Sequence, residues 1–444
     1  MLARARVWVK ENMNIKIRLT VMNFLQFGLW GAYLTSMGTF LAGAGFADKI
    51  GLFYATQGFV SIFMPALVGI VADRWVPAQK MLGLCHLLAA AAIAGAGYAG
   101  AQPVINFGVM FTLYTVSVAF YMPTIALSNS VAYTVLRQNN MDTVKVFPPI
   151  RVFGTVGFIC AMLTTNFAGF QTSYTQWYFS GVLGLLLGLY CFTLPACPTA
   201  TTAKTLAEAL GLKAFALFKE KKMAIFFIFS MLLGMSLQIT NGFAGPFITG
   251  FNSLEGFAGS WGANNANALI SLSQISETLC ILLIPFFLKR YGIKKVMLIS
   301  MFAWFLRFGF LGIGNPTTAT GIVFLVASMI VYGVAFDFFN VSGSLYVDQE
   351  TDPSIRSSAQ GVFMLMTNGL GAAIGSLAAQ KVINSLVNVH VNPAEMVNGV
   401  YPAAISQQIM QGWSNSWFVF AGFSLVVAIL FAIIFKYKHT PAEN

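Results

Sequence analysis

The sequence predicts an all-α polytopic membrane protein with twelve transmembrane helices in two six-helix bundles. The first observation is composition: of 444 residues, 57% are hydrophobic and only 9% are charged. The second is length, because apolar windows of about 20 residues, enough for a helix to cross roughly 30 Å of hydrocarbon, recur along the whole chain. The third is continuity, since these windows lack the alternating polarity of barrel strands.

The sequence contains twelve apolar windows, and we predict one membrane-spanning helix from each. They leave no room for a separate soluble domain. The predicted spans are residues 19–43, 51–72, 80–99, 105–128, 150–170, 175–195, 222–249, 266–289, 294–314, 318–345, 357–383 and 412–436. The basic N-terminal segment before residue 19 continues into the first span without a small-residue cleavage site, so we do not expect a signal peptide. The sequence leaves open whether Met1 or Met13 is the start.

The 25 Lys and Arg residues predict the orientation, because cytoplasmic loops near span ends collect them. With both termini in the cytoplasm, only Lys49 and Lys381 fall in outer loops, and Arg307 falls within a span. The net charge of +11 then follows from topology. Contact with anionic lipid accounts for it, and no nucleic-acid partner is needed.

The longest central hydrophilic segment predicts the domain organisation. Residues 196–221 form a cytoplasmic loop between one bundle at 1–195 and a second at 222–444. Two bundles of this kind are common in transporters. The loops after spans 2 and 8 also correspond, as RWVPAQKML at 74–82 and RYGIKKVML at 290–298, although short basic loops can match by chance.

The stretch GIVADR, residues 69–74, resembles the loop 2–3 signature of the major facilitator superfamily. In that superfamily a Gly, an Asp and basic residues latch the two bundles on the cytoplasmic side. The resemblance implies latch roles for Asp73, Arg74 and Arg290. The match is partial, because Lys289 stands where the second copy would carry the acid.

Cysteine and histidine residues show no metal-ligand spacing. We give no disulfide or metal role to the five cysteines, which are Cys85, Cys160, Cys191, Cys197 and Cys280. His86, inside span 3, is expected to be a hydrogen-bonded packing residue rather than a proton relay. We expect no cofactor.

Three charged side chains fall well inside spans, where a central Asp, Lys or Arg costs about 2.5–3.5 kcal/mol on insertion scales, and a fourth lies at the start of span 5. They are Arg151, Glu277, Arg307 and Asp337. Two acids and two bases favour pairing, because a buried charge needs a partner or must become neutral. Arg307 either snorkels or pairs structurally, so we leave it out of the candidate site.

Polar and aromatic side chains surround these charges at helical spacing. Separations of three or four residues place them on one face of a helix. The stripes consist of Arg151, Thr155 and Phe158 in span 5, Gln238 and Asn241 in span 7, Gln274 and Glu277 in span 8, and Tyr332, Phe336 and Asp337 in span 10.

A single amide pair of this kind would most simply bond between helices and hold the bundle together. The combination on four helices favours a solvated cavity. Amides and carboxylates would bind a neutral polyhydroxyl or heterocyclic solute, and the rings of Phe158, Tyr332 and Phe336 would stack on a flat ring.

Four long stretches indicate a more specific resemblance, to one family within the major facilitator superfamily. They are FPPIRVFGTVGF, AIFFIFSMLLGMSLQITN, SLSQISETLCILLIPFFLKRYGIKKVM and SMIVYGVAFDFFN, and they resemble the bacterial nucleoside permeases of the nucleoside:proton symporter family. The likeness extends from about Met13 to Lys438, although the segment 384–411 is long for the family. It implies nucleoside-binding roles for all ten residues of the stripes.

This resemblance implies a proton-coupled symporter that imports nucleosides across the bacterial cytoplasmic (inner) membrane by alternating access. Either Glu277 or Asp337 would carry the proton, and we favour Asp337 because its neighbours are more apolar. A monomer is expected. The alternatives are a proton-linked sugar permease and a transporter-like nutrient sensor. An enzyme is disfavoured, because the sequence contains neither HExxH nor GxSxG.

Overall fold

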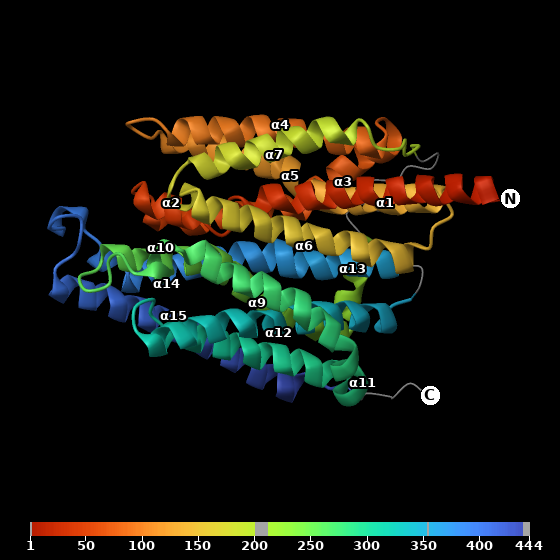
Figure 1. The fold of residues 1–444 in the computed structure, drawn as a ribbon. Coiled ribbons are helices and arrows are strands. Elements are labelled where there is room, and N and C mark those ends of the chain that lie inside the picture. Colours follow the sequence, from red (N-terminus) through yellow and green to blue (C-terminus); the bar gives the residue numbers. More distant parts are fainter. Residues whose placement is uncertain (1, 200–211, 353–354, 438–444) are drawn as a thin grey trace. The chain divides into compact units, whose positions relative to one another are not determined.

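The computed structural model describes residues 2–199, 212–352 and 355–437 (Figure 1). The side chains of residues 2–12 and 212–213, and those of Asp73, Val144 and Ser357, lie outside this description. Regular structure in the described residues is helical, apart from two isolated β-bridges.

The main helices follow one another along the chain, with longer connections between α7 and α9 and between α14 and α15. They are α1 (Leu2–Gly31), α2 (Met37–Gly43), α3 (Ile50–Arg74), α4 (Ala78–Gly100), α5 (Phe107–Gln138), α6 (Thr143–Phe167), α7 (Thr175–Cys191), α9 (Lys221–Gly250), α10 (Trp261–Asn264), α11 (Ala266–Ile313), α12 (Ala319–Glu350), α13 (Arg356–Met364), α14 (Ala372–Leu386) and α15 (Ala403–Ile434). A π-helical turn, Leu365–Gly371, joins α13 to α14.

The predicted spans coincide with these helices. Nine helical stretches of the described chain are long and apolar enough to cross a membrane. One of them, α11, is bent and covers two predicted spans, while α1 and α7 supply the remaining two. Several helices are longer than predicted, and α15 begins at Ala403 rather than 412. Hydropathy detects only the part that lies in hydrocarbon, whereas helical hydrogen bonds continue beyond it.

The bend in α11 lies at Gly292, with φ 74° and ψ 166°. A left-handed φ of this size is accessible to glycine without a steric penalty. The predicted loop between spans 8 and 9 is therefore reduced to a single sharp turn.

The first predicted span, 19–43, is interrupted between α1 and α2. The carbonyl of Ala32 accepts a hydrogen bond from the Thr165 hydroxyl at 2.9 Å, and the Thr35 hydroxyl donates to Asn267 Oδ1 at 3.1 Å. Side chains of other helices thus bind this segment where a continuous helix would otherwise run.

The chain divides into two compact units. One contains residues up to 34 together with 60–210, and the other contains 35–59 together with 211–444. Residues 35–59 therefore pack with the C-terminal helices: Gln380 of α14 accepts from the Gly51 N–H at 2.5 Å and donates to the Ala47 carbonyl at 2.9 Å. The predicted bundle boundaries stay a prediction, since residues 200–211 of the central loop lie outside the description.

In the first unit, α4 lies beside both α5 and α7 (Figure 1). The contact between α1 and α6 depends on Gly157, because a Cβ at that position would collide with the backbone carbonyl of Phe24. This close approach fixes the α6 residues of the candidate site against α1.

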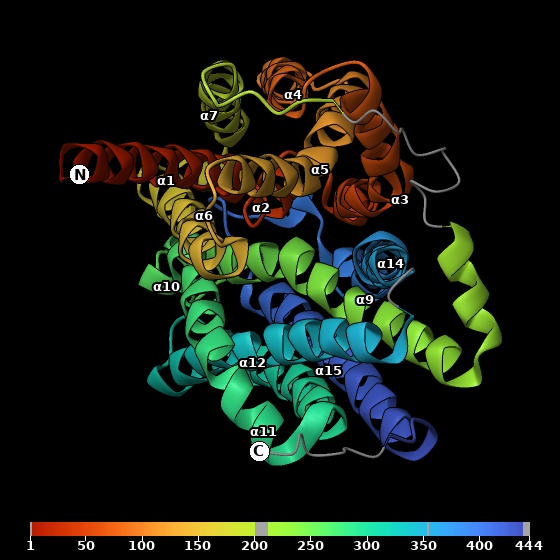
Figure 2. The same ribbon diagram turned by 90° about the vertical axis from the view of Figure 1, so that its right-hand side faces the viewer.

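In the second unit, α14 lies beside α9, and α12 lies beside α11 (Figure 2). The pair α11 and α12 encloses a buried apolar cluster of Cys280, Ile284, Val296 and Phe338. Val334 and Val341 of α12 also pack against this cluster, so apolar packing contacts α12 on both sides of Asp337 in the sequence.

The segment 387–402 between α14 and α15 is anchored to the residues after α9. The N–H of Tyr401 donates to the Ser253 carbonyl at 2.8 Å. Burial raises the pKa of the Tyr401 phenol, which is 3% exposed. The long segment expected at 384–411 is thus folded onto a neighbouring connection.

Candidate functional site

The polar residues of α11 and α12 are brought together by a close helix contact. A Cβ at Gly333 would lie 2.6 Å from the backbone oxygen of Ser276, so only glycine allows this approach. The Ser276 hydroxyl donates to the Ile330 carbonyl across the same contact. Glu277 follows Ser276, and Tyr332 precedes Gly333, so the contact places both beside the helix interface.

Tyr332 lies at the centre of this group. Its ring is stacked on Phe336, with centroids 5.9 Å apart and planes 10° apart, and Trp304 packs edge-on at 5.9 Å. Gln274, Glu277 and Asp337 are all near enough to Tyr332 to act on its hydroxyl electrostatically. The structure thus assembles all five residues predicted on α11 and α12.

The two acids differ in exposure. Asp337 is 3% exposed, and its Oδ2 is buried without a hydrogen-bond partner among the described residues. Glu277 is only half-buried. An electrostatic interaction links the two carboxylates, which repel each other when both are ionised.

The amides of α9 bond to one another, because Asn241 Nδ2 lies 3.5 Å from Gln238 Oε1. Gln238 is buried and Asn241 is half-buried. Their separation of three residues places them on one helix face, as the sequence predicts.

The first unit holds the predicted residues of α6. The Arg151 guanidinium lies 3.8 Å from the centroid of the Phe27 ring, within the range of a cation–π interaction. Phe158 meets Trp30 edge-to-face at 6.2 Å. Thr155 lies between them on the helix and is half-buried.

Sequence reasoning missed the two α1 aromatics, Phe27 and Trp30. Their spacing of three residues on an otherwise ordinary apolar helix carried no polar signal. The glycines at 154 and 157 of α6 were the available clue, because small residues mark where membrane helices approach closely.

His86 is fully buried and hydrogen-bonded, as predicted. Its Nε2 lies 2.7 Å from Gln26 Oε1, and the amide nitrogen of Gln26 donates to the Thr124 hydroxyl at 2.8 Å. An amide oxygen only accepts, so the His86 proton is on Nε2. The Tyr121 hydroxyl donates to the Gln26 carbonyl, and the Tyr121 ring packs on Trp30.

The predicted latch residues stay untested. Arg74 ends α3 and is exposed, while the side chain of Asp73 lies outside the described residues. Arg290 is exposed two residues before the bend at Gly292, with its guanidinium 5.8 Å from the Tyr291 ring centroid.

Arg307 does not snorkel, because its side chain is fully buried. The ion pairs of the described residues do not include it, so the structural pairing that the sequence left open for Arg307 does not involve an acid. Its contacts are hydroxyl, carbonyl and aromatic groups instead.

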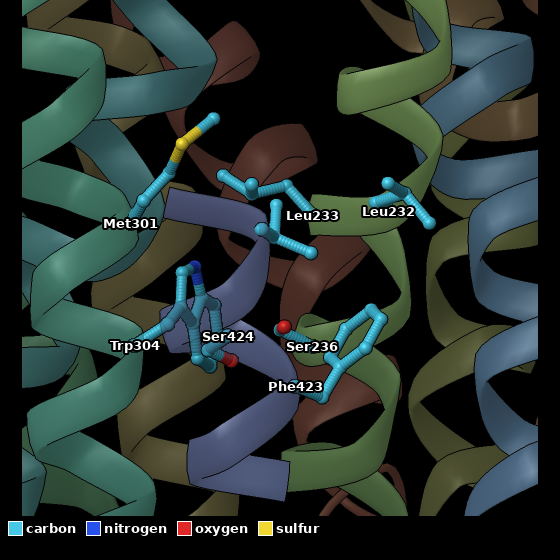
Figure 3. A pocket seen from close by; sticks show the side chains of 8 residues that line it. Leu232, Leu233, Ser236, Met301, Trp304, Phe423 and Ser424 are labelled. Carbon is cyan, nitrogen blue, oxygen red and sulfur yellow. The ribbon is translucent and has the colours of Figure 1, made fainter. Parts of the chain in front are cut away.

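A narrow crevice, too tight to hold a water molecule, lies between α9, α11 and α15 (Figure 3). Its lining is apolar except for the hydroxyls of Ser236 and Ser424. Trp304, which also contacts Tyr332, forms one wall. None of the ten predicted ligand residues lines it, so this crevice is not the candidate site.

Acid, thiol and imidazole groups of the described residues form no cluster of three that could hold a metal ion. The five cysteines are free thiols. Within the group around Tyr332, the structure places the two carboxylates of Glu277 and Asp337 close enough to interact electrostatically.

These features define a class. The fold is that of the major facilitator superfamily, and the chain is a multi-pass membrane protein. It belongs to the nucleoside H+ symporter family, whose model matches residues 13–440. This confirms the family resemblance seen in the sequence.

Individual relatives agree with the family. The chain is 45% identical over 431 residues to nucleoside permease NupG of Escherichia coli (strain K12), covering 96% of this chain and 97% of the relative. It is 46% identical over 435 residues to the xanthosine permease of the same organism, with 97% and 98% covered.

The fold matches a crystal structure of nucleoside transporter NupG with a TM-score of 0.82 and 44% identity. The match covers 96% of this chain and all of the other. These relatives are permeases and transporters by name, not enzymes.

Proposed function

We propose that this protein is a proton-coupled symporter that imports nucleosides by alternating access. The observation that carries the proposal is the group around Tyr332: two stacked rings beside an amide and two carboxylates. A nucleoside has a flat base for the rings and a ribose whose hydroxyls suit amides and carboxylates. Family membership and the names of the relatives support the same substrate class.

The proposed ligands are the ten residues of the stripes. Phe158, Tyr332 and Phe336 are proposed to supply the aromatic contacts to the base. The remaining seven offer hydrogen bonds: Arg151, Thr155, Gln238, Asn241, Gln274, Glu277 and Asp337. No further cofactor is proposed.

Asp337 is the proposed proton carrier, with Glu277 as the alternative. Its near-complete burial and its Oδ2 without a protein hydrogen-bond partner among the described residues support this choice, because burial disfavours the ionised form. In the proposed cycle the acid takes a proton on the outer side, and substrate and proton leave together on the inner side.

The proposed setting is the bacterial cytoplasmic (inner) membrane, with a monomer and both termini in the cytoplasm. The distribution of Lys and Arg supports this orientation. Asp73, Arg74 and Arg290 are proposed to latch the bundles on that side.

Uptake measurements test the function. Cells that lack their own nucleoside carriers would express the protein and receive labelled uridine, adenosine, xanthosine or a sugar, with and without a protonophore. We expect concentrative nucleoside uptake that the protonophore abolishes. Uptake of the sugar without any nucleoside would refute the proposal and favour the sugar permease.

A further inference from the structure

Arg307 of α11 is a buried charge that the proposed transport cycle does not use. Its side chain is 0% exposed. Nε lies 3.3 Å from the Thr240 hydroxyl of α9, and Nη1 donates to the Ser328 carbonyl of α12 at 2.8 Å. Nη1 also lies 3.3 Å from the Ser273 hydroxyl. Three helices therefore hold the guanidinium in one place.

The guanidinium lies over the face of a predicted substrate ligand. Its Cζ is 4.5 Å from the centroid of the Tyr332 ring. A cation in this position attracts the ring through its quadrupole, and the interaction strengthens when both groups are shielded from water. Burial of both side chains meets that condition, since Tyr332 is only 4% exposed.

The contacts around the ring fix its orientation from several sides. Arg307 covers a face, Trp304 packs edge-on, and Phe336 is stacked in a nearly parallel plane. The Ser328 carbonyl bound by Arg307 lies one helical turn before Tyr332 on α12. Arg307 thus binds both the ring and the backbone that carries it.

We propose that Arg307 is a positioning residue that holds the Tyr332 ring in its stack with Phe336, and so sets the affinity for the flat heterocycle of the substrate. The inference rests on the proposed nucleoside function. It assigns Arg307 no contact with the substrate. Removal of the guanidinium should weaken binding only as long as position 332 carries an aromatic ring.

A double-mutant cycle on purified protein tests this dependence. The dissociation constant for uridine would be measured by calorimetry for the wild type, Arg307→Gln, Tyr332→Leu and the double variant. We expect Arg307→Gln to weaken binding about tenfold in the wild type, the scale of a desolvated cation–π contact. In the Tyr332→Leu background the same change should have an effect of less than about twofold.

Two matched variants serve as controls for the double-mutant cycle. Tyr332→Phe keeps the ring, so Arg307→Gln should retain its full effect in that background. Ser424→Ala removes a buried hydroxyl from the crevice beyond Trp304 and should leave affinity unchanged. If Arg307→Gln does not fold, the cycle is run with Arg307→Lys, which keeps the charge but loses the planar guanidinium.

The outcomes separate the two proposals. An equal loss of affinity from the Arg307 change with and without the ring would overturn the positioning role, as would a folded Arg307 variant with wild-type affinity. Failure of the wild type to bind any nucleoside would instead refute the proposed function.

Discussion

At the scale of the residue, we propose that one of the two acids beside Tyr332 couples nucleoside uptake to proton entry. A proton that enters down one pH unit supplies about 1.4 kcal/mol, enough for roughly tenfold accumulation of a neutral solute. That coupling requires a carboxylate that binds a proton in one conformation and releases it in another. Asp337, which neighbours the buried Phe338 on α12, is the more buried of the two acids.

Replacement of Asp337 by Asn should uncouple transport from the proton gradient. Wild-type uptake should rise as the external pH falls, because the proton is a co-substrate. The Asp337→Asn variant should bring nucleoside only to its external concentration, with initial rates independent of external pH between about 5.5 and 8. Uptake of labelled uridine into cells at controlled pH measures both effects.

Glu277→Gln is the matched variant, because it neutralises the neighbouring acid in the same way. If Asp337→Asn retains concentrative, pH-dependent uptake while Glu277→Gln loses it, the proton belongs to Glu277. Retention in both variants would show that neither acid carries the proton.

At the scale of the element, close helix contacts position the α6 ligands. A Cβ at Gly157 would collide with the Phe24 carbonyl of α1. The contact is backbone against backbone, so no side-chain rotation can relieve it. On the same two helices, Arg151 lies over Phe27 and Phe158 meets Trp30.

Gly157→Ala should therefore separate α1 from α6. We expect a loss of about 1–3 kcal/mol in stability, typical of overpacking, together with reduced nucleoside affinity. Thermal unfolding of the purified protein in detergent measures the first effect. Gly422→Ala in α15 is the control, because a Cβ there would meet nothing within 4 Å. Equal unfolding temperatures for the two variants would contradict the packing argument.

At the scale of the whole molecule, the charge distribution predicts which loops face the cytoplasm. Trp75 follows Arg74 in the loop between α3 and α4 and is 68% exposed, while Val389 in the connection after α14 is 66% exposed. The two positions belong to loops predicted on opposite sides of the membrane.

Cysteine labelling tests this topology. With the exposed Cys160 replaced by Ser, a membrane-impermeant maleimide applied to intact cells should label Val389→Cys and leave Trp75→Cys unlabelled. Inverted vesicles should give the opposite pattern. Labelling of Trp75→Cys in intact cells would reverse the proposed orientation.

Sequence alone determined the helical class, the positions of the twelve spans and the stripes on α6, α9, α11 and α12. It could do so because the bilayer imposes a length on every span and a penalty on every charge within it. Helical spacing then places neighbouring polar residues on one face.

Tertiary structure alone decided which of these residues touch. How separate helices pack determines three features of the site. Asp337 is more buried than Glu277, the rings of Phe27 and Trp30 contact α6, and the Arg307 guanidinium lies over Tyr332. From the sequence, Arg307 could either snorkel or pair structurally. The fold surrounds Arg307 with hydroxyls, a carbonyl and an aromatic ring, because packing between helices can bring uncharged partners to a buried cation. Its Nη2 has no hydrogen-bond partner among the described residues.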